Sequence, residues 1–178
     1  MKTTVIDREL LAKAIYTLSR CDFRFGKYLF VTGTDPFSVL CGLLARESGA
    51  ASVVFCVDSA AEKQRMERMG FTAYDPELDE TASIVRQVTN GRKFDVVIET
   101  TGQLAAYERL VQMVRRGAAV ALLVGAERPC YFHICDVIRD QIRFVGIRNA
   151  DERSCRIADD MIRTGKLGRM KQTVQNGV

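Results

Sequence analysis

The segment "KYLFVTGTDPFSVLCGLL" (residues 27–44) places Gly33, Asp35 and Pro36 between a hydrophobic run and an amphipathic run. A strand that passes through a glycine-rich turn into a helix can bind phosphate, because the first helix amides face the ligand. The usual pattern for a dinucleotide is G-x-G-x-x-G. Here Asp35 and Ser38 stand where the second and third glycines are expected. The turn has the pattern of a phosphate site with an acid inside it.

Asp35 supports two interpretations. Its carboxylate would repel a phosphate by about 3 kcal/mol at ~5 Å and an effective dielectric constant of about 20. It would also form a good helix N-cap, with Pro36 at the first helical position. The amides that such a cap occupies are the ones that a phosphate needs. We therefore expect a turn that keeps its shape and has a weakened or lost cofactor site.

A second acid stands at the end of another predicted strand. Asp58 closes the run 52–58, and an acid there bonds the ribose hydroxyls and disfavours the extra phosphate of NADP. Asp58 is equally expected to cap the helix that begins near Ser59. Lys63 and Arg65 lie on that helix, where they would contact the ribose or a 2′-phosphate, or face solvent.

Small residues follow two further predicted strands. Ligands of open α/β sheets bind at the carboxyl ends of the strands, which here carry Thr100, Thr101, Gly102, Val124 and Gly125. Glu99 precedes this edge, and we assign it a structural role because no second group that could pair with it is near in sequence. No catalytic residue is predicted.

The elements that position these residues follow from hydrophobic periodicity. The expected strands are 28–32, 52–58, 72–74, 94–100, 118–125 and 142–147. The expected helices are 8–19, 36–47, 59–70, 80–89, 104–114, 134–139 and 151–165. Short apolar strands that alternate with amphipathic helices indicate an α/β fold, a doubly wound six-stranded parallel sheet with helices on both faces.

Composition limits the class of protein. The 178 residues, 47% hydrophobic and 27% charged, are typical of a single globular domain. The net charge of +4 is spread along the chain, so we expect no nucleic-acid partner. No apolar run approaches the ~20 residues that span a bilayer, and the N-terminus carries charges every few residues. We expect no membrane association and a cytoplasmic location.

The six cysteines show no C-x-x-C pairing, and we expect reduced structural thiols. The segment "CYFHICD" (130–136) contains Cys130, His133 and Cys135, but this spacing matches no common zinc pattern. No metal site is predicted.

An ordered series of segments resembles the nucleotide-binding (Rossmann) domain of the medium-chain, zinc-type alcohol dehydrogenase superfamily. These segments are "FGKYLFVTGTDPFSVLCGLLARESGAASVVFCVD", "EKQRMERMGFTAYDP", "NGRKFDVVIETTG", "LVQMVRRGAAVALLVG" and "RFVGIRNADERSCRIADDMIRTGKL". The resemblance implies one dinucleotide-binding domain over residues 1–178, with a leading helix and linker at 1–26 and a frayed tail at 167–178.

The resemblance also implies a cofactor, NAD in preference to NADP. Its contacts would be Gly33, Thr34, Asp35, Pro36, Phe37, Asp58, Ser59, Lys63, Thr100, Thr101, Gly102, Val124 and Gly125. In the superfamily a separate domain supplies zinc ligands, proton relay and most of the substrate pocket. No Gly-His-Glu zinc motif is present here and His133 is the only histidine, so we expect no zinc and no catalysis by this chain alone. The chain would be a remnant, an excised domain or one subunit of a split enzyme.

Three functions stay open at this point. The first is the cofactor domain of an oxidoreductase that works with a separate catalytic domain. The second is a degenerate Rossmann module with a structural or oligomerisation role and no cofactor. The third, a methyltransferase dependent on S-adenosylmethionine, is disfavoured because the turn lacks G-x-G and the sixth strand lacks an antiparallel hairpin pattern. The superfamily often pairs subunits through this strand, so a homodimer through 142–147 suits either of the first two.

Overall fold

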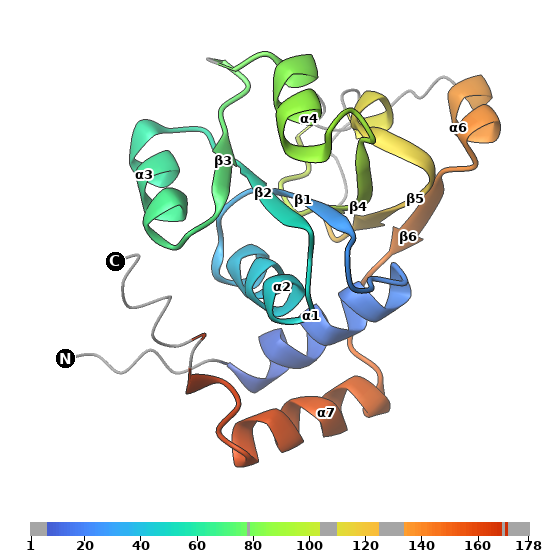
Figure 1. Cartoon of the computed structure of the whole chain (residues 1–178). Coiled ribbons are helices and arrows are strands. Elements are labelled where there is room, and N and C mark those ends of the chain that lie inside the picture. The colour runs from blue at the N-terminus through green and yellow to red at the C-terminus, as the bar shows by residue number, and fades with distance from the viewer. Residues whose placement is uncertain (1–6, 78, 104–109, 125–133, 169, 171–178) are drawn as a thin grey trace.

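The fold is an all-parallel sheet between two layers of helices in the computed structural model, which describes residues 7–77, 79–103, 110–124, 134–168 and 170 (Figure 1). The strands are β1 (Tyr28–Thr32), β2 (Ser52–Cys56), β3 (Thr72–Tyr74), β4 (Phe94–Glu99), β5 (Val114–Leu122) and β6 (Arg143–Gly146). The helices are α1 (Arg8–Arg20), α2 (Pro36–Glu47), α3 (Ala60–Arg68), α4 (Thr81–Thr89), α6 (Ile134–Asp140) and α7 (Glu152–Arg163).

The strand order is β3-β2-β1-β4-β5-β6, and every pairing is parallel. β1 is therefore a central strand, and the chain direction across the sheet reverses between β1 and β4. The predicted doubly wound six-stranded parallel sheet is confirmed. In the described residues no strand pairs antiparallel, as the methyltransferase alternative would require.

Each face of the sheet packs its own hydrophobic core. Helices α1, α2 and α7 cover one face of the sheet and α4 covers the other (Figure 1). In β1, Leu29 and Val31 belong to the core of the first face and Phe30 to the core of the second. The ring of Phe30 lies 5.1 Å from that of Phe94 and 6.0 Å from that of Tyr74. Because side chains alternate along a strand, one short apolar segment contributes to both layers.

The helix boundaries follow the capping residues. Asp7 and Asp151 accept hydrogen bonds from Leu10 N and Ser154 N at the starts of α1 and α7. Asn90 ends α4 in the left-handed conformation, with φ of 51°, and Gly91 follows. These ends agree with the sequence, because Asp, Asn and Gly supply the bonds or dihedral angles that helix termini need.

The segment before β5 differs from the prediction. Residues 104–109 of the expected helix 104–114 lie outside the described residues, and 110–113 are helical, but Val114 already pairs with Phe94. The register then shifts, so that Val96 pairs with Ala119, and β5 ends at Leu122 instead of residue 125. The side chain of Arg115 reaches Asp95 across this irregularity. That ion pair favours an extended start to β5 over a longer helix.

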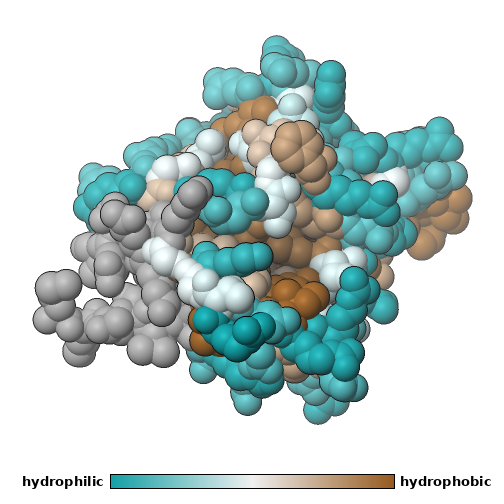
Figure 2. Space-filling view, turned by 60° about the horizontal axis from the view of Figure 1, so that its bottom comes forward, coloured by the Kyte–Doolittle hydropathy of each residue, from teal (hydrophilic) through white to brown (hydrophobic). Residues whose placement is uncertain are grey.

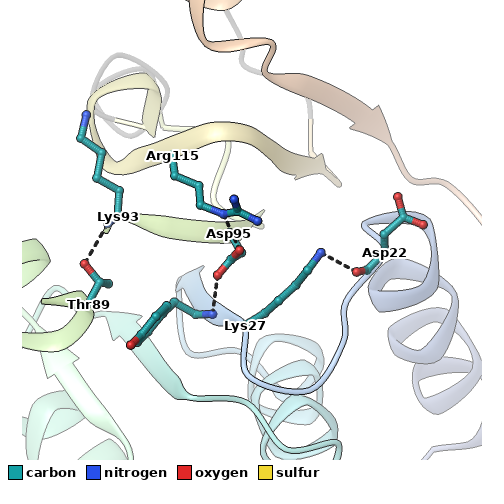
Figure 3. Close-up of polar contacts among 7 residues, drawn as sticks. Asp22, Lys27, Thr89, Lys93, Asp95 and Arg115 are labelled. Atoms are coloured by element: carbon teal, nitrogen blue, oxygen red, sulfur yellow. Dashed lines mark hydrogen bonds and ion pairs between the residues drawn. The ribbon is translucent and has the colours of Figure 1, made fainter. Parts of the chain in front are cut away.

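The amino ends of β1, β4 and β5 are joined through the buried carboxylate of Asp95 (Figure 3). It accepts a hydrogen bond of 2.8 Å from Tyr28 N and pairs with the guanidinium of Arg115. Nearby, Lys27 Nζ donates to Asp22 O at 2.6 Å, and burial is the main cause that lowers the pKa of Lys27. These contacts lie at the opposite edge from the carboxyl ends of the strands and fix how the strands start.

The tail that was expected to fray from residue 167 is packed at its start. Leu167 and Met170 each expose 3% of their surface and belong to the core beneath α1 and α7. Residues 171–178 lie outside the described residues. In the described part of the chain, no helix is both long and apolar enough to cross a bilayer.

Candidate functional site

A cleft of about 470 Å³ opens at the carboxyl edge of the sheet, where the strand order reverses. Ligands of open α/β sheets bind at this point. The cleft is lined by Phe30, Thr32, Gly33, Thr34, Asp35, Pro36, Cys56, Val57, Asp58, Glu62, Arg65, Tyr74, Pro76, Thr100, Thr101, Gln103, Leu110 and Met113. Its floor is apolar and its rim carries three acids and one arginine.

The structure brings some of the predicted contact residues into this cleft and leaves others out. Those that line it are Gly33, Thr34, Asp35, Pro36, Asp58, Thr100 and Thr101. Phe37 is buried in the core, Ser59 caps α3, and Lys63 forms an ion pair of 3.1 Å with Asp79. Gly102 and the 45% exposed Val124 also lie outside the lining, and Gly125 lies outside the described residues.

Asp35 caps α2. Its Oδ1 accepts hydrogen bonds from Phe37 N at 2.9 Å and from Ser38 N at 3.2 Å, and its Oδ2 accepts from the Ser38 hydroxyl. Ser38 Oγ also lies 2.9 Å from Thr100 Oγ1, whose hydroxyl donates to Thr32 O. The helix amides that would bind a phosphate are thus occupied by the protein's own carboxylate.

Gly33 is required where the turn meets the loop after β4. Its φ of +77° is a conformation that other residues rarely adopt. A Cβ at this position would lie 2.9 Å from Thr100 Oγ1 and 3.2 Å from Thr101 Cγ2. Gly33 therefore allows the turn after β1 to contact the loop after β4. Thr100 and Thr101 occupy the space where a side chain at position 33 would lie.

Two side chains of α3 bind Thr34, on the other side of the turn. The hydroxyl of Thr34 is hydrogen-bonded to Glu62 Oε1, and the guanidinium of Arg65 donates to Thr34 O. Arg65 Nε is buried without a hydrogen-bond partner. The sequence analysis did not name Glu62, and it expected Arg65 to contact the ribose or a 2′-phosphate or to face solvent. No local signal identifies Glu62, because its partner Thr34 is 28 residues away along the chain.

Asp58 and Glu62 form a close acidic pair at the rim. Asp58 N donates to Glu62 Oε2 at 3.3 Å, and hydrogen bonding and charge repulsion from Glu62 raise the pKa of Asp58. Burial alone would raise the pKa of Glu62, but hydrogen bonds with Thr34 and Asp58 outweigh it and lower that pKa. The cap of α3 is Ser59, whose hydroxyl accepts from Glu62 N at 3.3 Å. Asp58 is thus left free of the capping role.

Glu99 organises the loop after β4. It is fully buried, and its Oε1 accepts from Thr101 N at 2.8 Å, Thr101 Oγ1 at 2.6 Å and Gly102 N at 3.0 Å. The hydroxyl of Thr32 is 3.3 Å from the same oxygen. Glu99 Oε2 is buried without a partner. These contacts agree with the structural role assigned to Glu99, because the carboxylate positions Thr100 and Thr101 at the cleft.

The thiols and acids of the described residues show no metal centre. No group of three or more His, Cys, Asp or Glu side chains there is arranged to hold an ion. Cys130 and His133 of the "CYFHICD" segment lie outside the described residues. Burial raises the pKa of Cys21 to about 12, which keeps this thiol protonated and unreactive.

The dinucleotide cofactor that this fold commonly binds fits one half of the cleft and not the other. The apolar floor and the acids at the end of β2 suit an adenosine. The start of α2, where the pyrophosphate would lie, is occupied by Asp35. Fold and cleft together define a Rossmann-type nucleotide-binding domain.

Residues 38–163 match the family model described as zinc-binding dehydrogenase. The chain belongs to this family, and it corresponds to the NAD(P)-binding half of zinc-type, alcohol dehydrogenase-like oxidoreductases.

Curated relatives extend the comparison beyond that match. Sorbitol dehydrogenase 1 of Saccharomyces cerevisiae is 24% identical over 166 residues, which cover 89% of this chain and 46% of the relative. An L-threonine 3-dehydrogenase of Symbiobacterium thermophilum is 27% identical over 145 residues, covering 79% and 40%. The chain spans about half the length of these relatives.

Solved structures share the fold. An alcohol dehydrogenase from Thermotoga maritima superposes with a TM-score of 0.81 at 19% identity, over 94% of this chain and 47% of that one. A zinc-binding dehydrogenase from Sinorhizobium meliloti bound to NADP gives a TM-score of 0.76 at 22% identity, over 89% and 47%. These matches support the assignment of the sheet and its switch point.

Proposed function

We propose that this chain is the NAD-preferring cofactor-binding part of an alcohol dehydrogenase-like oxidoreductase, and that catalysis needs a domain or subunit outside residues 1–178. The observation that carries this proposal is the cleft at the switch point, with Asp58 and Glu62 at its rim. A nicotinamide dinucleotide, when bound, supplies hydride transfer. The residues of this chain bind and orient the adenosine end: the acids accept from the ribose hydroxyls, and the apolar floor packs against the base.

Charge favours NAD over NADP in this arrangement. A 2′-phosphate would add negative charge beside Asp58 and Glu62, where the hydrogen bond with Glu62 and then charge repulsion from it already raise the pKa of Asp58. Arg65 is the one cation among the described cleft residues, and its guanidinium is engaged by Thr34 O. This part of the cleft has two carboxylates and one guanidinium, which is already hydrogen-bonded. This charge balance disfavours the 2′-phosphate of NADP.

Fluorescence titration with NADH and NADPH tests the preference. We expect NADH to bind at least about tenfold tighter than NADPH, since one screened charge pair is worth on the order of 1 kcal/mol or more. The double variant Asp58→Asn, Glu62→Gln should bring the ratio towards one. Glu67→Gln, an exposed acid of α3 outside the cleft, is the matched control and should leave the ratio unchanged. Tighter NADPH binding by the native chain would overturn the preference.

A second candidate is a structural module without a cofactor, and the hydrogen bonds of Asp35 favour it. They satisfy the amides at the start of α2 without any ligand. If neither the native chain nor an Asp35→Asn variant binds a nucleoside or nucleotide, this candidate replaces the first.

We also propose that the chain pairs with a second copy along β6. This strand is the last of the sheet, so one of its edges has no partner strand in the described chain. Ile134 and Ile138 of the adjoining α6 expose 63% and 69% of their surface. Figure 2 shows hydrophobic surface at its right-hand edge, the side on which α6 lies in Figure 1.

Sedimentation velocity tests the pairing. We expect a dimer for the native chain and a monomer for the double variant Ile134→Asp, Ile138→Asp. Ile157→Asp on α7 is the matched control, because this isoleucine is also exposed but lies on another helix. A native chain that sediments as a monomer at all concentrations would contradict the proposal.

A cytoplasmic location completes the proposal. Cys21, Cys41, Cys135 and Cys155 are thiols without a disulfide bond, which suits a reducing compartment. Cell fractionation followed by immunodetection measures the location, and recovery in an oxidising compartment would refute it.

A further inference from the structure

In the turn between β1 and α2, three donors of the protein itself bind the carboxylate of Asp35. The first two amides that α2 offers are bound to the carboxylate. The hydroxyl of Ser38 donates to its other oxygen and lies 2.9 Å from Thr100 Oγ1. Asp35 therefore holds the place of an anion at the phosphate position, and it carries the charge that such an anion would bring.

The turn also has little room to open. Thr100 and Thr101 lie within 3.2 Å of where a Cβ on Gly33 would stand, so the loop after β4 packs against the backbone of the turn. On the other side, Glu62 and Arg65 hold Thr34 through its hydroxyl and its carbonyl. A phosphate would have to displace a carboxylate that accepts hydrogen bonds from Phe37 N, Ser38 N and the Ser38 hydroxyl.

The rest of the cleft remains suited to a nucleoside. Its apolar floor includes Phe30, Tyr74, Leu110 and Met113, and its acidic rim at Asp58 and Glu62 can accept from a ribose diol. Three carboxylates and one guanidinium line it among the described residues, so its charge balance repels anions and attracts cations.

We infer that this cleft prefers an adenine nucleoside without a 5′-phosphate, and that Asp35 sets the preference. In an ordinary dinucleotide turn each added phosphate gains helix amides and affinity. Here each added phosphate meets the Asp35 carboxylate instead, so affinity falls along the series adenosine, AMP and ADP. A positively charged 5′-substituent would be attracted to the same carboxylate. This inference rests on the adenosine half of the proposed function, and it predicts that the pyrophosphate of NAD lowers the affinity for this cleft.

Calorimetric titration of the whole chain with adenosine, AMP, ADP and 5′-amino-5′-deoxyadenosine measures the order directly. We expect adenosine to bind about tenfold tighter than AMP, AMP tighter than ADP, and the 5′-amino compound several-fold tighter than adenosine.

Asp35→Asn removes the charge and keeps a side chain that caps helices well. In this variant, adenosine should bind only about twofold tighter than AMP, or less, instead of tenfold tighter. The 5′-amino compound should no longer bind more tightly than adenosine. Asp151→Asn makes the same change at the cap of α7, which does not line the cleft, and should leave the native order intact. Thermal melts establish that both variants are folded.

The outcomes distinguish the inference about Asp35 from the proposed cofactor-binding function. If ADP or NADH binds the native chain more tightly than adenosine does, the inference about Asp35 is wrong and the proposed cofactor function stands. If no compound binds the native chain or Asp35→Asn, both are wrong. If Asp151→Asn changes the order as Asp35→Asn does, the effect is general electrostatics and the role of Asp35 is refuted.

Discussion

Asp35 combines two roles that usually belong to different molecules, since it caps a helix and takes the place of a bound anion. Asp35→Gly should strengthen NADH binding by on the order of 1–2 kcal/mol, because it removes a screened carboxylate and lets the backbone approach the pyrophosphate. The lost cap should cost about 0.5–1 kcal/mol of unfolding free energy, although Gly is tolerated at N-caps. Fluorescence titration and thermal melts measure these two effects separately.

The opposite result would have a clear meaning. Tight binding of NADH by the native chain, weakened by Asp35→Gly, would show that the aspartate supports the cofactor.

Glu99 is the second residue whose removal has a specific consequence. Its buried carboxylate accepts hydrogen bonds from Thr101 and Gly102, and these donors would lose their acceptor in Glu99→Ala. We expect a loss of about 3 kcal/mol in unfolding free energy, because the buried donors would be left without an acceptor. Urea denaturation measures it, and a change below ~0.5 kcal/mol would refute the organising role.

The predicted contact residues of the turn that line the cleft are those with a local signal. Gly33, Asp35 and Pro36 follow one another in a turn, so their roles could be deduced from spacing and capping chemistry. Glu62 could not be found in this way, because its partner Thr34 is 28 residues away along the chain and meets it only when α3 packs beside the turn. Lys63, which was also predicted as a contact, does not line the cleft and forms an ion pair with Asp79.

Helix α2 lies so close to β2 that only glycine fits at one of its positions. A Cβ on Gly42 would lie 2.5 Å from the ring of Phe55, which is fully buried. Gly42→Ala should therefore destabilise the protein by about 1–2 kcal/mol, even though alanine favours a helix by about 1 kcal/mol over glycine. Thermal and urea unfolding measure the net change.

Gly168→Ala is the matched control for Gly42→Ala. Open space surrounds its Cβ position and its φ is not positive, so we expect a change within ~0.5 kcal/mol. If Gly42→Ala stabilises the protein as helix propensity alone predicts, the close approach of α2 and β2 is not maintained in solution.

Most elements could be predicted because each carries its own periodicity and its own cap. The start of β5 could not, because "LVQMVRRG" has helical spacing up to Val114 and the deciding contact is distant. Asp95 of β4 pairs with Arg115 and also accepts from Tyr28 N (Figure 3). One buried carboxylate thus sets the beginnings of three strands, and no local pattern encodes it.

At the scale of the whole molecule, the 178-residue chain should bind a cofactor without oxidising alcohols. Its relatives are about twice as long, and it carries no Gly-His-Glu zinc motif. Assays for substrate-dependent NADH formation, together with metal analysis, should give neither turnover nor stoichiometric zinc. Stoichiometric zinc with alcohol-dependent NADH formation would contradict this expectation.

Acid should destabilise the fold below about pH 4. Hydrogen bonds from neighbouring groups hold the pKa of five carboxyl groups below the ordinary value: Glu62, Asp79, Asp140, Asp151 and Asp159. A lowered native pKa contributes stability above the unfolded value of about 3.9, and this stability is lost as the pH falls through the native pKa. Asp58, whose pKa is raised, contributes with the opposite sign.

Thermal melts from pH 7 to pH 2.5 measure this dependence. The midpoint should change little above about pH 5 and fall steeply below about pH 4. Asp151→Asn should show a smaller fall, because one of the five groups no longer titrates. A midpoint that is constant down to pH 3 would refute the expectation.

The central place of β1 has a consequence for synthesis on the ribosome. Leu29 pairs with Val53 on one side and with Val96 on the other, so its second partner lies 96 − 29 = 67 residues further along the chain. A nascent chain that has emerged only through β3 can assemble β1, β2 and β3 but leaves one edge of β1 unpaired in the middle of the future sheet. Such an edge is a template for wrong pairing, and distant parallel contacts form slowly. The interval in which the ribosome translates α4 and β4 is therefore when this protein is most exposed to aggregation and most dependent on chaperones.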